Sequence, residues 1–281
     1  MNCVGWLRML RPVQWLKNLM VYFPSFLGGG VLLIGLSWRS LLPFAAFCCA
    51  SSAGYVFNDL IDCQRDAAHP TKKLRPLPSR QITVLGASLV CVVLAILTII
   101  TSLAVSLPFL YFTLTYLLSA ACYSLLLKDV AILDVFCISL GFVLRLYGGG
   151  EAFQIVVSDW LFLTVFLLAI FLSLGKRYSE QRILGDDAGI HRRTLEEYPR
   201  GFLEGAMYLS GAAVLVTYAI YAMSHPPMVY SVPLCMFGLL RYLLRVKGGA
   251  SGDPTDSLTR DLPLFATGLL WAAFVGWSVY W

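Results

Sequence analysis

Oxygen-bearing side chains recur at every fourth position in one short polar segment: Asn58, Asp62 and Asp66. On an α-helix, residues four apart lie on the same face, so the spacing predicts a row of one amide and two carboxylates. Like charges at this spacing repel, which makes the row a poor surface feature. Such oxygen ligands suit Mg²⁺, which binds one or two carboxylates together with substrate phosphates. We therefore expect these three side chains to form a catalytic Mg²⁺ site, which could also take Mn²⁺. Asp59 lies off this face.

Basic residues follow the acidic row directly. Lys72 and Arg75 stand among prolines at Pro70 and Pro76, which keep the segment out of a regular helix. Their charges can therefore fold back over a phosphate that the metal holds. The alternative is the ordinary excess of Lys and Arg in cytoplasmic connectors, but the position directly after the row favours phosphate binding.

The elements that must position these residues are membrane helices. Hydrophobic residues make up 58% of the 281-residue chain and charged residues only 13%, whereas a soluble domain has about 25% charged residues. Apolar runs long enough to cross a bilayer recur along the whole chain. The composition and these runs predict an all-α integral membrane protein. We expect nine transmembrane helices, over residues 19–36, 40–57, 83–102, 106–126, 131–149, 159–175, 205–223, 228–244 and 262–281.

The cations predict the orientation. All of the 21 Lys and Arg residues except Arg39 and Arg145 fall at the N-terminus or in connectors on its side of the membrane. By the positive-inside rule, the N-terminus is cytoplasmic and the C-terminus outside, as in a bacterial-type inner membrane. We expect one domain over 1–281, with an interfacial helix at 1–18. Polar cytoplasmic connectors at 58–82 and 176–204 should cover the site.

Other residue types offer no second site. The eight cysteines contain no CxxC and lie mostly within apolar runs, so we interpret them as packing residues. The three histidines are too dispersed to form a metal cluster. The net charge of +5 suits anionic lipids or phosphorylated substrates, and we expect membrane lipids and no nucleic acid among the partners.

The segment NDLIDCQRDAAHPTKKLRP at 58–76 resembles the NDxxDxxxD…HPxKxxRP signature of the UbiA-type prenyltransferase superfamily. Further stretches at 10–24, 127–150, 174–180 and 241–264 are most similar to its polyprenyl-phosphate (decaprenyl-phosphate) phosphoribosyltransferase branch. The resemblance implies a nine-helix bundle around a central cavity open to the cytoplasm. It also implies Mg²⁺-dependent transfer of a 5-phosphoribosyl group from phosphoribosyl diphosphate to a polyprenyl phosphate, with release of diphosphate, in cell wall biosynthesis.

A second position separates this branch from prenyl transfer. Prenyl-transferring members of the superfamily resemble one another in a DxxxD motif at the cytoplasmic end of the sixth helix. The corresponding place here holds Lys176, Arg177 and Glu180. Cations in place of metal-binding carboxylates predict direct contact with phosphate, which suits a pocket for two anionic substrates. We interpret Asp186 and Asp187, a few residues further on, as part of a solvated loop.

The fifth expected helix carries Asp134 and Arg145, eleven residues apart and at nearly the same azimuth. Arg145 lies about three turns into the bilayer, where an unpaired arginine costs about 2.5–3.5 kcal/mol or more. It must therefore face the bundle interior and find an anion. Pairing with an acid such as Glu151 and anchoring of a substrate phosphate both stay open.

Two anionic substrates would need several cations to offset their mutual repulsion. The lipid phosphate is already ionised at neutral pH, so no strong general base is required. Asp134 could orient either a ribose hydroxyl or one of the cations. The expected substrate-binding residues are Lys17, Lys72, Arg75, Lys128, Asp134, Arg145, Lys176, Arg177 and Glu180.

Two other functions stay open. A prenyltransferase that moves a polyprenyl group from its diphosphate to an aromatic or quinone-precursor acceptor would use the same metal row, but the second DxxxD is missing. A non-enzymatic Mg²⁺ or lipid transporter would need polar groups across the membrane, whereas the ionisable residues gather at one mouth. The sequence indicates neither the isoprenoid chain length nor the oligomeric state.

Overall fold

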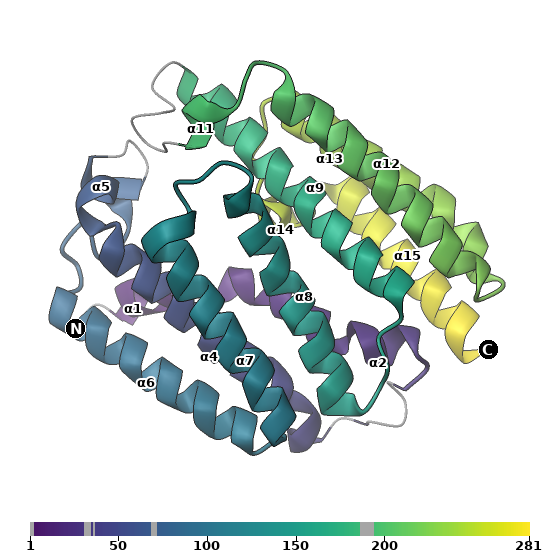
Figure 1. The fold of residues 1–281 in the computed structure, drawn as a ribbon, viewed down its shortest axis with the longest axis horizontal. Helices are drawn as coiled ribbons and strands as arrows, with labels where there is room; N and C mark the ends of the chain where they lie inside the picture. Colours follow the sequence, from purple (N-terminus) through teal and green to yellow (C-terminus); the bar gives the residue numbers. More distant parts are fainter. Residues whose placement is uncertain (1–2, 31–34, 36, 69–71, 186–193) are drawn as a thin grey trace.

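The computed structural model describes residues 3–30, 35, 37–68, 72–185 and 194–281, and all regular structure among them is helical (Figure 1). Eight helical stretches of the described chain are long and apolar enough to cross a membrane, so the chain is a multi-pass membrane protein. They are α4 (Trp38–Ile61), α6 (Val84–Leu103), α7 (Leu107–Cys122) continued by η3 (Tyr123–Leu127), α8 (Leu133–Phe153), α9 (Asp159–Leu184), α12 (Phe202–Met223), η5 (Met228–Ser231) continued by α13 (Val232–Lys247), and α15 (Leu262–Tyr280).

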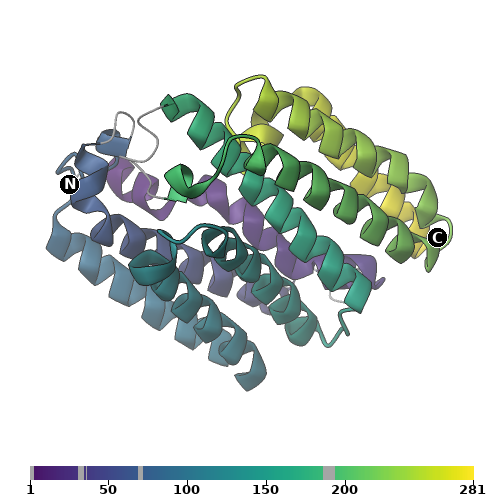
Figure 2. The ribbon, with the colours of Figure 1, turned by 45° about the horizontal axis from the view of Figure 1, so that its top comes forward.

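These eight stretches match eight of the nine expected spans. Shorter helices complete the described chain: α1 (Cys3–Leu10), η1 (Pro12–Tyr22), α2 (Phe23–Leu27), α5 (Cys63–Ala67), η2 (Lys72–Leu74), α11 (Thr194–Glu197) and α14 (Pro254–Arg260). α8 is the most buried of the eight and α6 and α15 the least. α8 therefore lies at the centre of the bundle, and α6 and α15 expose their apolar side chains at its edges (Figures 1 and 2).

The remaining expected span, 19–36, is different in structure. Its described part contains the end of η1, all of α2 and a glycine turn, and residues 31–34 and 36 lie outside the described residues. A 3₁₀-helix rises about 2.0 Å per residue against 1.5 Å for an α-helix, so η1 and α2 together extend roughly 30 Å, close to the thickness of a bilayer core. Figure 1 shows this purple segment running behind α7 and α8. A ninth crossing, by η1 and α2, stays a prediction.

Glycine permits η1 to pack closely on α8. A Cβ atom at Gly149 would overlap the carbonyl oxygen of Val21 on η1. At the neighbouring Gly148, a Cβ atom would come within 2.9 Å of the ring of Phe47, so α4 also packs closely on α8. Asn18 of η1 is fully buried and donates to Ser51 Oγ of α4 at 3.1 Å. The segment that carries Lys17 is thereby fixed between α4 and α8.

Candidate active site

A cavity of about 260 Å³ opens among η1, α4, the α7–η3 helix, α8 and α9. Most of the residues that the sequence predicts to be functional line it. Asp66 and Asp134 do not, although each holds a cation that does. The predicted residues on the wall are Lys17, Asn58, Asp62, Lys72, Arg75, Lys128, Arg145, Lys176, Arg177 and Glu180.

The helix that carries the acidic row breaks within it. α4 ends at Ile61, α5 begins at Cys63, and Asp62 lies in the turn between them. Hydrogen bonds of helical spacing still link the row, from Asp62 N to Asn58 O at 2.9 Å and from Asp66 N to Asp62 O at 2.8 Å. The break nevertheless leaves only Asn58 and Asp62 on the cavity wall, whereas a continuous helix would align all three side chains.

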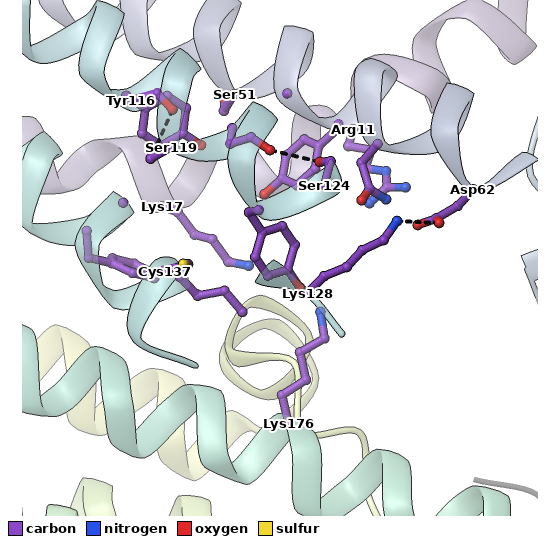
Figure 3. A pocket seen from close by; sticks show the side chains of 18 of the residues that line it. Arg11, Lys17, Ser51, Asp62, Tyr116, Ser119, Ser124, Lys128, Cys137 and Lys176 are labelled. Atoms are coloured by element: carbon purple, nitrogen blue, oxygen red, sulfur yellow. Dashed lines mark hydrogen bonds and ion pairs between the residues drawn. The ribbon is translucent and has the colours of Figure 1, made fainter. Parts of the chain in front are cut away.

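Each carboxylate in this region contacts a cation. Lys128 Nζ donates to Asp62 Oδ1 (Figure 3). Arg75 Nη1 donates to Asp66 Oδ2 at 2.5 Å and to Asp59 Oδ1 at 3.1 Å. Burial raises the pKa of Asp66, and the nearby charges of Arg75 and Lys72 oppose this increase only in part.

Asp59, which the helical spacing leaves off the row, also binds Arg11 at 2.6 Å. It thereby holds two cations of the wall, Arg11 and Arg75. Arg11 was not among the predicted site residues, although it lies in the stretch 10–24 that resembles the phosphoribosyltransferase branch.

The oxygen donors on the wall fit a hard divalent cation. No three His, Cys, Asp or Glu side chains cluster closely enough to hold a metal ion within the described part of the chain. The amide oxygen of Asn58 and the carboxylate of Asp62 would therefore provide two ligands. Mg²⁺ commonly completes such a shell with substrate phosphates and water.

The wall formed by α9 contains a buried ion network. Arg177 is 1% exposed, and its Nε donates to Asp134 Oδ2 at 2.6 Å while its Nη1 donates to Glu180 at 2.7 Å. Tyr198 OH donates to the other oxygen of Asp134 at 3.1 Å, and burial raises the pKa of Tyr198 to about 12. Asp134 thus orients a cation, one of the two roles that the sequence allowed for it.

Arg145 occupies the deep end of the cavity and is 4% exposed. It donates to Asn18 Oδ1 at 2.7 Å, to the carbonyl of Gly141 at 2.8 Å and to Tyr116 OH at 2.9 Å. Its guanidinium also lies 4.5 Å from the ring centre of Tyr116. Among the described residues, these hydrogen-bond partners are all neutral, and neither Glu151 nor another carboxylate is one of them.

Lys128 reaches the site from an irregular helix end. The last turn of the α7–η3 helix is a π-helix, in which the N–H of Lys128 donates to the carbonyl of Tyr123 at 3.0 Å. Such turns are rare and often mark functional sites. Tyr123 and Ser124 of this turn line the cavity, and the sequence did not predict them.

Asp253 is a further residue that the sequence analysis missed. It follows α13 and contacts both Lys17 Nζ at 3.7 Å and Lys176 Nζ at 3.6 Å. Burial acts to raise its pKa, but these two cations, with the backbone N–H groups of Asp256 and Thr255, lower the pKa of Asp253 to about 2. The carboxylate is therefore ionised at neutral pH.

Comparisons with known proteins place this geometry in a family. The model of the UbiA prenyltransferase family matches residues 21–266. Decaprenyl-phosphate phosphoribosyltransferase of Mycobacterium tuberculosis is 30% identical, over 98% of this chain and 94% of its own length. The protein of the same name from Mycolicibacterium smegmatis is 29% identical, over 98% of this chain and 92% of its own length.

Among solved structures, a UbiA homologue from Archaeoglobus fulgidus bound to GPP and Mg²⁺ has a similar fold. Its TM-score is 0.77 at 24% identity, over 98% of this chain and 99% of the other. This likeness supports the helical architecture described above.

Proposed function

The chain belongs to the UbiA prenyltransferase family, and on that premise we propose that it transfers a 5-phosphoribosyl group from phosphoribosyl diphosphate to a polyprenyl phosphate, releasing diphosphate. The names of the relatives that match nearly the whole chain support this choice within the family. The observation that carries it is the charge of the cavity wall. Eight cationic side chains line the cavity, against the two carboxylates of Asp62 and Glu180. That excess suits two anionic substrates bound together.

The cations stand on more than one side of the cavity. Arg75 contacts Asp66 of α5, and Lys128 contacts Asp62 in the turn between α4 and α5. Lys17 and Lys176 extend into another part of the cavity, away from Asp62 (Figure 3). Separate clusters of cations can hold a diphosphate and a phosphate monoester side by side and offset their repulsion.

Asn58 and Asp62 are the residues that would hold the metal. A bound Mg²⁺ would supply charge neutralisation for the leaving diphosphate. Mn²⁺ has the same preference for oxygen ligands and would serve in its place. Asp66 would act from behind the wall, by holding Arg75 towards the same phosphate groups.

The reaction breaks the bond between the anomeric carbon and the diphosphate oxygen and forms one between that carbon and an oxygen of the lipid phosphate. Positive charge develops on the ribose ring as the first bond breaks. The phosphate nucleophile is already an anion, so no side chain needs to remove a proton. The cavity residues therefore act by holding both anions in line and by stabilising the departing charge.

We also propose that the cavity mouth and the N-terminus face the cytoplasm of a bacterial-type inner membrane. The donor is a charged, water-soluble molecule, whereas the acceptor is a lipid. The basic connectors next to the cavity favour the cytoplasmic side by the positive-inside rule.

The test offers purified protein two substrate pairs side by side, each with Mg²⁺. One pair is phosphoribosyl diphosphate with a polyprenyl phosphate, and the other is a polyprenyl diphosphate with an aromatic acid or quinone precursor. We expect diphosphate release and a lipid-linked phosphoribose from the first pair alone. Turnover of the second pair alone would replace the proposal with prenyl transfer to a ring acceptor.

A further inference from the structure

The connector between α13 and α14 is fixed against the cytoplasmic end of α9. Tyr242 OH donates to the carbonyl of Gly252 at 2.7 Å, and Ser179 Oγ of α9 donates to the carbonyl of Ala250 at 3.0 Å. A Cβ atom at Gly252 would overlap the carbonyl oxygen of Gly175. Close backbone packing therefore fixes the position of the next residue, Asp253, which lies behind the cavity wall and contacts two of its lysines.

That residue, Asp253, uses its two oxygens differently. Oδ1 caps α14 by accepting from Thr255 N at 3.0 Å and from Asp256 N at 3.4 Å. Oδ2 faces Lys17 Nζ and Lys176 Nζ, at 3.7 and 3.6 Å. Any good N-cap residue could cap α14. Only an anionic side chain can also form ion pairs with two ammonium groups.

The two lysines come from distant parts of the chain. Lys17 lies on η1 and Lys176 on α9, and their ammonium groups both contact the same carboxylate oxygen. Two cations so close to one another in a partly buried cavity repel strongly, and the carboxylate offsets that repulsion. Both distances exceed the 2.7–3.2 Å range of a good N–H···O hydrogen bond, so the ammonium N–H groups can still donate to a ligand.

We propose that Asp253 is a positioning residue that holds Lys17 and Lys176 as one phosphate-binding pair. The inference rests on the proposed function, because it assigns the pair a phosphate group of one of the two substrates. Asp253 acts through the lysines and need not touch substrate. The donor and the acceptor both carry phosphate, so the experiment separates them by their individual KM values.

The test is Asp253→Asn in the full-length protein. Asparagine caps a helix as well as aspartate does, so this variant retains α14 while removing the charge. We expect KM for one substrate to rise roughly tenfold, which is the effect of weakening one charge-assisted hydrogen bond to phosphate. The KM of the other substrate and kcat should change less than about twofold.

Asp261→Asn is the matched control. Asp261 also caps a helix, accepting from Leu264 N at 2.9 Å, and also pairs with two cations, Arg241 and Arg245. None of these residues lines the cavity. Both variants lose one carboxylate at a helix cap, so only an effect through the lysines can separate their KM values. The melting temperatures of the two variants show how much each substitution destabilises the fold, independently of substrate binding.

A second measurement tests whether Asp253 changes KM through Lys17 and Lys176. In a protein that already carries Lys17→Ala and Lys176→Ala, Asp253→Asn should raise KM no further, because the groups through which it acts are gone. An unchanged KM for both substrates in the single variant would overturn the inference. So would an equal rise for both, or a rise that persists without the lysines. If wild-type protein turns over neither substrate pair, the proposed function fails instead.

Discussion

At the scale of single residues, the carboxylate of Asp62 can bind a metal ion and also forms an ion pair with Lys128. It lines the cavity next to Asn58 and also accepts from Lys128. A metal ion at this carboxylate would take over the neutralising role of Lys128, and the ammonium would then be available to a phosphate. Metal binding and phosphate binding are expected to reinforce each other for that reason.

We predict that Asp62→Asn weakens Mn²⁺ binding tenfold or more, because it replaces a charged ligand with a neutral one. Electron paramagnetic resonance of Mn²⁺ titrated into the protein with diphosphate measures this without any turnover. Transferase activity should fall in parallel, and EDTA should abolish it in wild-type protein. Asp159→Asn, in the first turn of α9 and outside the cavity wall, serves as the control. Wild-type affinity for Mn²⁺ in Asp62→Asn would remove this carboxylate from the metal site.

Single residues were predictable from sequence where spacing or membrane depth constrained them. The helical repeat of Asn58 and Asp62, and the cost of a charge as deep as Arg145, both indicated the cavity. Asp253 was not predictable, because the pattern Asp-Pro at a helix start indicates a cap and carries no information about Lys17, which is 236 positions away. Contacts between distant segments decide such roles.

At the scale of elements, the packing of η1 on α8 determines where Lys17 stands. Gly149 permits this approach because any side chain there would collide with the backbone of Val21. Asn18, the neighbour of Lys17, links η1 to both α4 and Arg145. Displacement of η1 would therefore disturb the deep end of the cavity as well as the lysine.

We predict that Gly149→Ala destabilises the protein by about 1–3 kcal/mol, as overpacking of a tight interface does, and also reduces activity. Gly205→Ala is the matched control, since nothing lies within 4 Å of a Cβ placed there on α12. That substitution should stabilise the protein by up to about 1 kcal/mol through helix propensity. Thermal melting in detergent measures both, and equal melting temperatures would mean that η1 adapts to the larger residue.

The membrane-spanning helices were predictable from sequence where hydropathy alone defines their bounds. Seven apolar runs became long helices close to their expected bounds, whereas α9 continues past the expected end at 175 to Leu184, so that Lys176, Arg177 and Glu180 lie on the helix and not in a connector. The first run was harder to place, because η1 begins at Pro12, before the apolar run, and includes the polar residues Lys17 and Asn18, so hydropathy does not show where this helix starts. The break at Asp62 also has no sequence signal, since neither glycine nor proline stands there.

At the scale of the whole molecule, the two ends of the chain lie at opposite ends of the bundle in both views (Figures 1 and 2). The eight long helical stretches alone would return the C-terminus to the side where the chain began, because an even number of crossings does so. Counting η1 with α2 as a crossing makes the number odd and agrees with the positions of α1 and α15.

We therefore predict that reporters at the N-terminus and after Arg200 lie in the cytoplasm, and that reporters after Ser224 and at the C-terminus lie outside. The connector that follows α12 and the C-terminus are at the same end of the bundle (Figure 1), so the two outside reporters must agree with each other. A fluorescent protein that matures only in the cytoplasm and a phosphatase active only outside give complementary readings at each position. A cytoplasmic C-terminus together with a cytoplasmic N-terminus would mean that η1 and α2 enter the membrane without crossing it. Lys17 would still line the cavity in that case, but the chain would have an even number of spans.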